Sequence, residues 1–216
     1  LAPLSHLALV ITTDLMDIDA ESGSARYQGD TLSGKMAMAR AGIERIILQA
    51  KEGLALSNGA SFSAAIGALA VFDAATLLKA GEISLALSLE ALMGCSAAFD
   101  ERLHRARGFT GQAKVAENVR ALISGSNLVD RARRVQDAYS LRCAPQVQGA
   151  CRDTLDFVQR IIEIEINAAT DNPLLFDPGV ALSGGNFPGE PIGMVMDYLG
   201  IALTELAAIS ERRTSR

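Results

Sequence analysis

Apolar residues recur at helical spacing along most of the chain, and short polar stretches interrupt them. Near the start, Leu4, Leu7 and Ile11 follow a proline at position 3, which predicts a short helix within residues 1–16. Longer helical patterns occupy residues 51–94, 112–124, 149–167 and 192–213. The pattern predicts an all-α protein built as a bundle of long helices.

The stretch 51–94 carries apolar residues on nearly every side, which is typical of a helix buried all round. Its many small residues allow neighbouring helices to approach closely, and Gly67 and Gly81 are the points at which we expect it to divide. In residues 112–124, Val115, Val119 and Leu122 are expected to face inward.

Three segments depart from the long-helix pattern. Residues 17–34 are polar and glycine-punctuated, and predict a small hairpin or loop excursion centred on Gly29 and Asp30. Residues 35–48 are expected to be helical, with a strand as the alternative at Ile46, Ile47 and Leu48. Residues 172–191 hold four of the six prolines and are predicted to be a connecting loop.

Composition narrows the function classes. A chain of 216 residues that is 49% hydrophobic can bury a substantial core, and its net charge of −5 argues against nucleic acid as a partner. The three cysteines lack the CxxC spacing of a zinc site and are odd in number, which favours a reducing cytoplasm over a disulfide framework. His6 and His104 do not have metal-ligand spacing, so no metal site is predicted. We found no uncharged apolar stretch long enough for a membrane span and expect no membrane association.

Four polar islands lie at helix ends or breaks, where side chains can face a cavity. They are Asn58 with its neighbours, QDAYSLRC at 136–143, INAATDNP at 166–173 and SGGNFPGEP at 183–191. Each has a simpler structural interpretation: Asn58 as a turn residue, Arg142 in a surface ion pair, Tyr139 as a buried hydrogen-bonding phenol, Asp171-Asn172-Pro173 as a turn initiator and Gly184-Gly185-Asn186 as a loop. If their segment is helical, Tyr139 and Arg142 share one face. Convergence of the islands on one site would explain all four together.

In this order, the motifs resemble the aromatic amino-acid ammonia-lyases and aminomutases, with the histidine ammonia-lyases as the nearest branch. The matching stretches cover essentially the whole chain: LAPLSHLAL at 1–9, KEGLALSNG at 51–59, QDAYSLRCAPQVQGA at 136–150, EINAATDNPLLF at 165–176, SGGNFPGEP at 183–191 and SERR at 210–213.

The resemblance implies a carbon–nitrogen lyase that uses a methylidene-imidazolone group and needs no metal or nucleotide. In that family the group forms from an Ala-Ser-Gly triad immediately before the LAPLSHLAL motif, so the triad is not present in this chain. We therefore expect residues 1–216 to be the central helical-bundle part of the catalytic domain, truncated at both ends and inactive alone. The family's homotetramers, with active sites built from several subunits, imply a homo-oligomer, and we expect the isolated chain to associate.

The resemblance also assigns roles to particular residues. Arg142 would bind the carboxylate of the amino-acid substrate, because its planar guanidinium offers a bidentate, charge-assisted contact. Tyr139, Asn58 and Gln136 would be the catalytic residues, donating to developing charge or moving a proton. Phe187 would pack against the substrate ring or the electrophile.

From the TDNP turn, Asn172 would support the electrophile. The implied reaction is elimination of ammonia from L-histidine to give urocanate. Two departures keep a phenylalanine or tyrosine ammonia-lyase, or an aminomutase, as the alternative: Pro188 stands where the histidine enzymes have histidine, and Ala138 where they often have proline. A non-catalytic helical fragment or oligomerisation scaffold is the alternative of another class, although it would not require this set of polar residues.

Overall fold

The computed structural model describes residues 1–215, and the chain forms two compact units. The first unit comprises Leu1–Ala65 and Glu165–Glu190, and the second comprises Ile66–Ile164 and the residues from Pro191 onward. Helices dominate, and the strands that accompany them are short and pair only in twos. The predicted all-α class is thus confirmed.

The first unit begins with a helix and a small hairpin. Its elements to residue 47 are α1 (Ala2–Ile11), β1 (Thr12–Thr13), the 3-10 helix η1 (Asp19–Glu21), β2 (Ser24–Tyr27), β3 (Asp30–Ser33), α2 (Gly34–Ala41) and β4 (Ile46–Ile47). The antiparallel pair β2–β3 places Tyr27 opposite Asp30, which confirms the predicted hairpin but moves its turn to Gln28 and Gly29, one residue earlier than predicted. β4 pairs in parallel with β1, so the strand alternative at Ile46 and Ile47 is the correct one.

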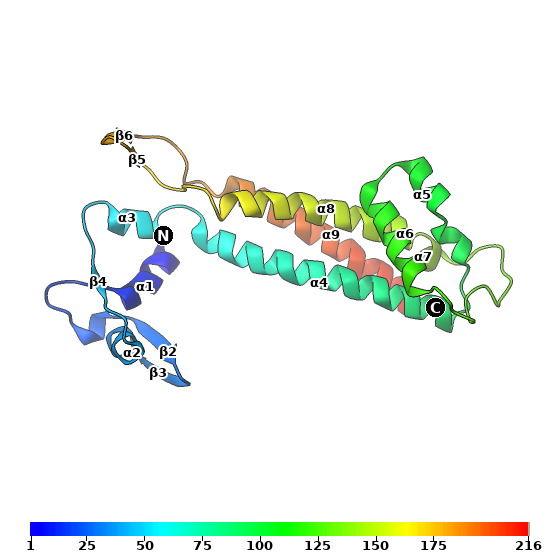
Figure 1. Ribbon diagram of the computed structural model, residues 1–216, viewed down its shortest axis with the longest axis horizontal. Helices are drawn as coiled ribbons and strands as arrows, with labels where there is room; N and C mark the ends of the chain where they lie inside the picture. The colour runs from blue at the N-terminus through cyan, green and yellow to red at the C-terminus, as the bar shows by residue number, and fades with distance from the viewer. Residues whose placement is uncertain (216) are drawn as a thin grey trace. The chain divides into compact units, whose positions relative to one another are not determined.

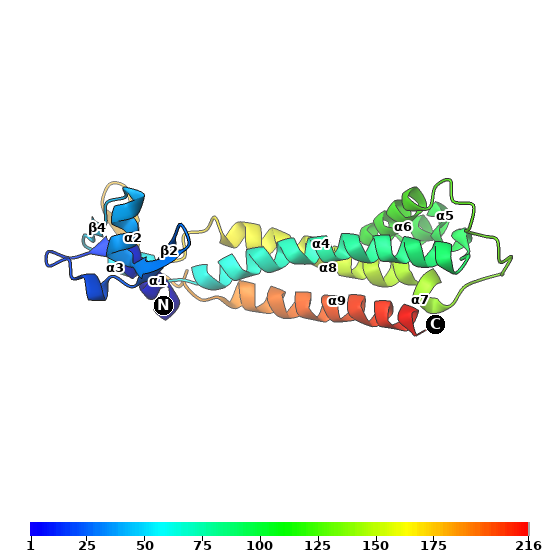
Figure 2. The ribbon, with the colours of Figure 1, turned by 90° about the horizontal axis from the view of Figure 1, so that it is seen from below.

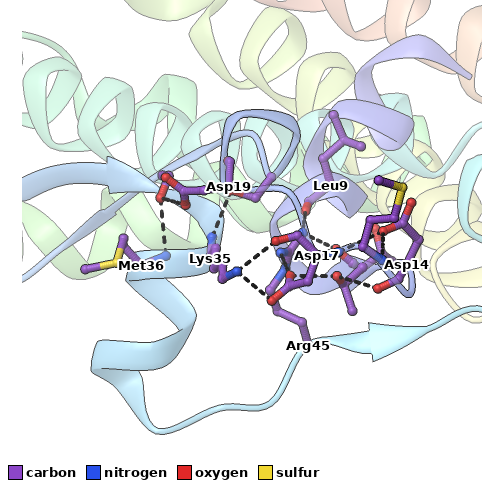
Figure 3. A network of polar contacts seen from close by, with 12 residues as sticks. Leu9, Asp14, Asp17, Asp19, Lys35, Met36 and Arg45 are labelled. Carbon is purple, nitrogen blue, oxygen red and sulfur yellow. Dashed lines mark hydrogen bonds and ion pairs between the residues drawn. The ribbon is translucent and has the colours of Figure 1, made fainter.

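A polar network around Asp17 ties this excursion to α1 (Figure 3). The carboxylate of Asp17 forms ion pairs with Lys35 at 2.8 Å and with Arg45 at 2.7 Å. Arg45 also donates to the main-chain carbonyls of Leu9 and Thr12, at the end of α1. Hydrogen bonding to Lys35 is the main cause of the lowered pKa of Asp17. Segments from both sides of the hairpin are therefore held by one carboxylate.

The predicted helix over 51–94 is broken at Asn58, not at Gly67 or Gly81. α3 (Glu52–Ser57) ends there, and α4 (Ser61–Ala91) begins after a short turn. Gly59 in that turn has φ of 82°, a left-handed conformation that glycine adopts readily. The helix therefore divides at Gly59, where the backbone is left-handed, and continues through the mid-helix glycines Gly67 and Gly81.

The predicted connecting loop at 172–191 contains a hairpin that the sequence analysis missed. β5 (Leu174–Phe176) pairs antiparallel with β6 (Val180–Leu182), and Phe176 lies opposite Val180. The prolines of this region stand outside the two strands, which have only three residues each.

In the second unit, three long helices run side by side, as both views show (Figures 1 and 2). They are α4 from Ile66 onward, α8 (Ala144–Glu165) and α9 (Glu190–Thr214). A Cβ at Gly67 would lie 2.9 Å from Ile162 of α8, so the small residues of α4 do allow close approach. α8 starts at Ala144, earlier than the predicted 149, because Pro145 lies in its first turn, where a proline is tolerated.

Shorter helices pack at one end of this bundle: η2 (Ser96–Phe99), α5 (Glu101–Arg107), α6 (Thr110–Leu122) and α7 (Tyr139–Arg142). The hydrophobic core there includes Leu85, Leu89 and Phe99 together with Val115 and Val119 of α6. The predicted inward face of 112–124 is thus confirmed for both valines. Leu122, however, is exposed, because the helix ends at this residue.

The predicted all-round burial of α4 is not found within the single chain. Large apolar side chains are exposed along its length: Phe62, Ile66, Leu69, Phe72, Leu77, Ile83 and Leu87. α8 and α9 cover one face of the helix, and a sequence pattern cannot tell which faces have neighbours.

By length and composition, the segments Glu52–Ala91 and Glu190–Thr214 could each cross a membrane, so the prediction that no segment is long enough was wrong. Core helices of soluble proteins pass the same test, so this is weak evidence for a membrane protein.

Candidate functional site

One group of predicted site residues surrounds Asp171 in the first unit. Asn58, at the end of α3, donates from Nδ2 to Oδ1 of Asp171 at 2.9 Å. Lys51, just before α3, places Nζ 2.5 Å from Oδ2 of the same carboxylate and 3.2 Å from the carbonyl oxygen of Asn172. Asp171 thereby connects the KEGLALSNG motif to the TDNP turn.

Close backbone contact reinforces this connection. A Cβ at Gly59 would lie 2.3 Å from the carbonyl oxygen of Thr170, so only glycine fits against the turn. The hydrogen bonds from Lys51 and Asn58 lower the pKa of Asp171 to about 2, with Lys51 the larger cause. The carboxylate is therefore ionised at neutral pH and acts as an acceptor only.

Asn172 extends the same network to the loop of the SGGNFPGEP motif. Its Oδ1 accepts a hydrogen bond of 2.7 Å from the backbone N–H of Gly184. Its own backbone N–H donates to Oδ1 of Asp171 at 2.7 Å. Phe187, three residues beyond Gly184, has a partly exposed ring. Three of the four polar islands thus meet within one unit.

The second group of predicted residues lies on α7 in the second unit. The guanidinium carbon of Arg142 lies 4.4 Å from the centre of the Tyr139 ring, which confirms that the two side chains share a helical face. Within residues 1–215, Arg142 forms no ion pair, and its buried Nε has no hydrogen-bond partner. Tyr139 is largely exposed. A guanidinium held by a ring but not neutralised is suited to an incoming carboxylate.

Gln136 precedes α7 and is exposed. Its neighbour Asp137 is buried, accepts a hydrogen bond of 2.5 Å from the backbone N–H of Cys95, and pairs with Arg134 at 3.0 Å. Asp137 therefore anchors the chain immediately before Tyr139.

The structure brings Asn58 and Asn172 together around Asp171, and Tyr139 together with Arg142, in two different units. That all of them, with Gln136 and Phe187, serve one site stays a prediction. A cavity of about 500 Å³ in the second unit is lined by none of them; its walls include Phe109, Phe157 and Tyr198. Over the described part of the chain, no cluster of three or more His, Cys, Asp or Glu side chains is arranged to hold a metal ion.

Sequence reasoning missed Lys51 and did not recognise Asp171 as more than a turn residue. The two residues are 120 positions apart, so no local spacing rule links them. The only available signal was that the two residues have opposite charges and lie in two recognised motifs. Many other pairs of charged residues in the chain have opposite charges too, so this signal does not single them out.

Comparison with known proteins shows what the chain is related to. The model of the family described as "Aromatic amino acid lyase" matches residues 1–216. Histidine ammonia-lyases from Clostridium tetani and Geobacillus kaustophilus are each 52% identical over 218 aligned residues, covering 100% of this chain. The alignments cover 41% and 42% of those proteins, so the chain spans about two fifths of the length of the curated relatives it matches.

Solved structures agree with this relationship. Tyrosine aminomutase from Streptomyces globisporus superimposes with a TM-score of 0.89 at 38% identity, over 100% of this chain and 44% of that one. Histidine ammonia-lyase from Trypanosoma cruzi superimposes with a TM-score of 0.85 at 40% identity, over 100% of this chain and 40% of that one. With a family model that matches along its whole length, the chain belongs to the aromatic amino acid lyase family.

Proposed function

We propose that the protein containing this chain eliminates ammonia from L-histidine to give urocanate. The single observation that carries the chemistry is Arg142, a guanidinium stacked on Tyr139 at 4.4 Å and free of ion pairs within residues 1–215. The choice of histidine among amino acids is supported by the 52% identity to histidine ammonia-lyases. We place the reaction in the cytoplasm.

Substrate binding starts with the charged end of the amino acid. Arg142 offers two parallel N–H donors to the carboxylate, and its position over the Tyr139 ring limits the orientations of the guanidinium. Tyr139 is then close to the bound substrate and can transfer a proton through its hydroxyl. Phe187 provides an aromatic face for the substrate ring, and Gln136 a further amide donor.

The first unit has the donors that a methylidene-imidazolone group would need. Asn58 uses one Nδ2 hydrogen on Asp171, and Asn172 uses its Oδ1 on Gly184, so each keeps an amide N–H that no other residue in 1–215 engages. Such donors fit a carbonyl oxygen that becomes more negative during a reaction. The N-terminal helix α1 packs against α3, so the start of the chain belongs to the same unit as these amides. When present, the group supplies the electrophile that activates the substrate amine as a leaving group.

Oligomerisation is part of the proposal. Several large apolar side chains of α4, among them Leu69, Phe72 and Leu87, are more than half exposed, and large exposed apolar patches often mark an interface. Packing of this surface against further copies, as a homotetramer, would remove it from water. Light scattering that shows a monodisperse monomer of the full-length protein would contradict this part.

The test uses the full-length protein, offered L-histidine, L-phenylalanine and L-tyrosine separately. Ultraviolet absorbance follows the conjugated product, and a coupled assay follows released ammonia. We expect both signals with histidine. Formation of product only from phenylalanine or tyrosine would instead indicate a phenylalanine or tyrosine ammonia-lyase. Formation of a β-amino acid without release of ammonia would indicate an aminomutase. If no product forms from any of the three amino acids, the protein would be better explained as a non-catalytic scaffold.

Arg142→Ala tests the binding role. Loss of a bidentate charge-assisted contact should raise KM about 100-fold, since each tenfold corresponds to about 1.4 kcal/mol. Arg160→Ala is the matched control, because Arg160 also lies over an aromatic ring, Phe157, at 5.7 Å but outside the predicted site. Equal kinetics for the two variants would remove Arg142 from the site.

Tyr139→Phe should lower kcat more than it changes KM.

A further inference from the structure

We infer that Asp171 is a positioning residue for Asn58, and that Lys51 holds Asp171 in place. This inference rests on the proposed function, in which Asn58 contacts the reacting groups. It adds two residues to the site that neither motif spacing nor the family resemblance assigned.

The carboxylate of Asp171 is fully engaged. Oδ1 accepts from Asn58 Nδ2 at 2.9 Å and from the backbone N–H of Asn172 at 2.7 Å, while Oδ2 faces Lys51 Nζ at 2.5 Å. The side chains of Lys51 and Asp171 are only 21% and 17% exposed. Donors from three directions therefore determine where the carboxylate points.

An ionised carboxylate accepts hydrogen bonds and cannot donate them, and this fixes the orientation of the Asn58 amide. The NH₂ end must face Asp171, so Oδ1 and the second N–H are directed elsewhere. The backbone of Asn58 is separately held by its N–H bond to Leu54 at 2.8 Å. With the backbone fixed, the remaining freedom lies in the side-chain torsions, and Asp171 removes it.

Lys51 adopts a conformation that is unusual for its residue type. Its φ is 78°, in the left-handed region that favours glycine, and such a residue persists where its surroundings require it. Here the side chain reaches both Asp171 and the carbonyl oxygen of Asn172. Glycine would relieve the backbone but would remove the cation that contacts Asp171.

The experiment is a double-mutant cycle in the full-length enzyme with Asp171→Asn, Asn58→Ala and both together. If Asp171 acts through Asn58, Asp171→Asn should lower kcat about 10- to 100-fold with KM changed less than about 3-fold. In the Asn58→Ala background, the second substitution should have almost no further effect. Asp171→Glu, which keeps the charge, should restore part of kcat.

Asp100→Asn is the matched control, because Asp100 also pairs through both oxygens with an arginine, Arg102, far from the proposed chemistry along the chain. It should leave kcat unchanged. The inference is overturned if the effects of Asp171→Asn and Asn58→Ala multiply, or if kcat does not change in Asp171→Asn. Intact mass must show the same loss of water in all variants, since failure of the triad to cyclise in Asp171→Asn would give Asp171 a different role.

A crystal structure of the full-length Asp171→Asn variant separates this inference from the proposed function. We expect the Asn58 side chain in a changed or mixed rotamer, with its contact to residue 171 lengthened beyond 3.5 Å. An unchanged Asn58 would overturn the inference even if the wild type is a lyase. Conversely, a wild type without activity on any amino acid would refute the proposed function, while a displaced Asn58 would still support the positioning role.

Discussion

The Lys51–Asp171 pair of the first unit and the buried charges in the helical bundle of the second unit have different surroundings. In the first unit, Lys51 and Asp171 lie in a turn region, keep some exposure, and satisfy each other together with neighbouring amides. The second unit contains charged side chains that are buried among its helices, Glu82 and Arg213 among them. Glu82, whose side chain is 5% exposed, pairs with Arg152 at 2.5 Å and accepts from Asn118 at 2.8 Å.

Arg213 in the same bundle has no such partners. The residue is 7% exposed, and neither NH1 nor NH2 has a hydrogen-bond partner within residues 1–215. It borders a cavity of about 290 Å³ between α4 and α9, beside Ser84 and Ser210. Burial alone lowers its pKa. We therefore expect the sign of a buried charge's effect on stability to depend on its partners as much as on its depth.

The largest effect is expected from Glu82→Gln. Removing this charge leaves Arg152 without its counter-ion, and breaking a largely buried pair should lower the free energy of unfolding by about 3 kcal/mol. Urea denaturation followed by circular dichroism measures it. Glu117→Gln is the control, because Glu117 pairs with Lys114 at 2.8 Å on the surface of α6. Equal losses in the two variants would show that burial does not distinguish these pairs.

Arg213→Met should act in the opposite direction. Methionine keeps the flexibility of the side chain but removes a buried cation that has no ion-pair partner within residues 1–215, so the free energy of unfolding of the 216-residue chain should rise by about 1 kcal/mol. The neighbouring Arg212→Met, at a surface arginine paired with Glu211, should change it little. A clear loss of stability in Arg213→Met would mean that a carboxylate or another acceptor pairs with the guanidinium in solution.

Much of the fold was predictable because helical periodicity is a local property. The hairpin at β2–β3 followed from its turn residues, and the shared face of Tyr139 and Arg142 followed from three-residue spacing. The exposed side of α4 was not predictable in the same way. An apolar residue such as Phe72 has the same identity whether or not a neighbour covers it, so only the structure reveals which face is open.

The candidate site was predictable only where a motif carried it. Asn58 and Asn172 were singled out by family resemblance, and the structure then placed Asp171 between them. Lys51 gave no comparable signal, because its partner is distant in the sequence and exposed lysines are common. Two residues far apart in the sequence form an ion pair only if the fold brings them together. Composition and local spacing do not show which distant segments meet.

A smaller, pH-dependent effect is expected from Lys51→Met. The pKa of Asp171 is about 2 in the folded chain, below the ordinary aspartate value of 3.8, so its contribution to stability is present above about pH 4 and is lost as the pH falls towards 2. Without Lys51, the largest cause of this shift, the folded pKa should rise and the contribution should shrink. Thermal unfolding between pH 2 and 6 should show wild type and variant converging at the acidic end. A constant difference at all pH values, or an equal change in the exposed Lys79→Met, would contradict this.

The smallest effect is expected at the surface pair of Asp30 and Arg40 in the first unit. Their atoms are 3.1 Å apart, but the side chains are 66% and 49% exposed, so water and salt screen the attraction. Asp30→Asn removes the charge and keeps a side chain of nearly the same shape at the first residue of β3, which isolates the ion pair from the hairpin geometry. The free energy of unfolding should fall by less than about 0.5 kcal/mol, and 1 M salt should abolish the difference. A loss that is larger and independent of salt would place this pair with Glu82 and Arg152, and would show that exposure is not what separates weak from strong ion pairs in this chain.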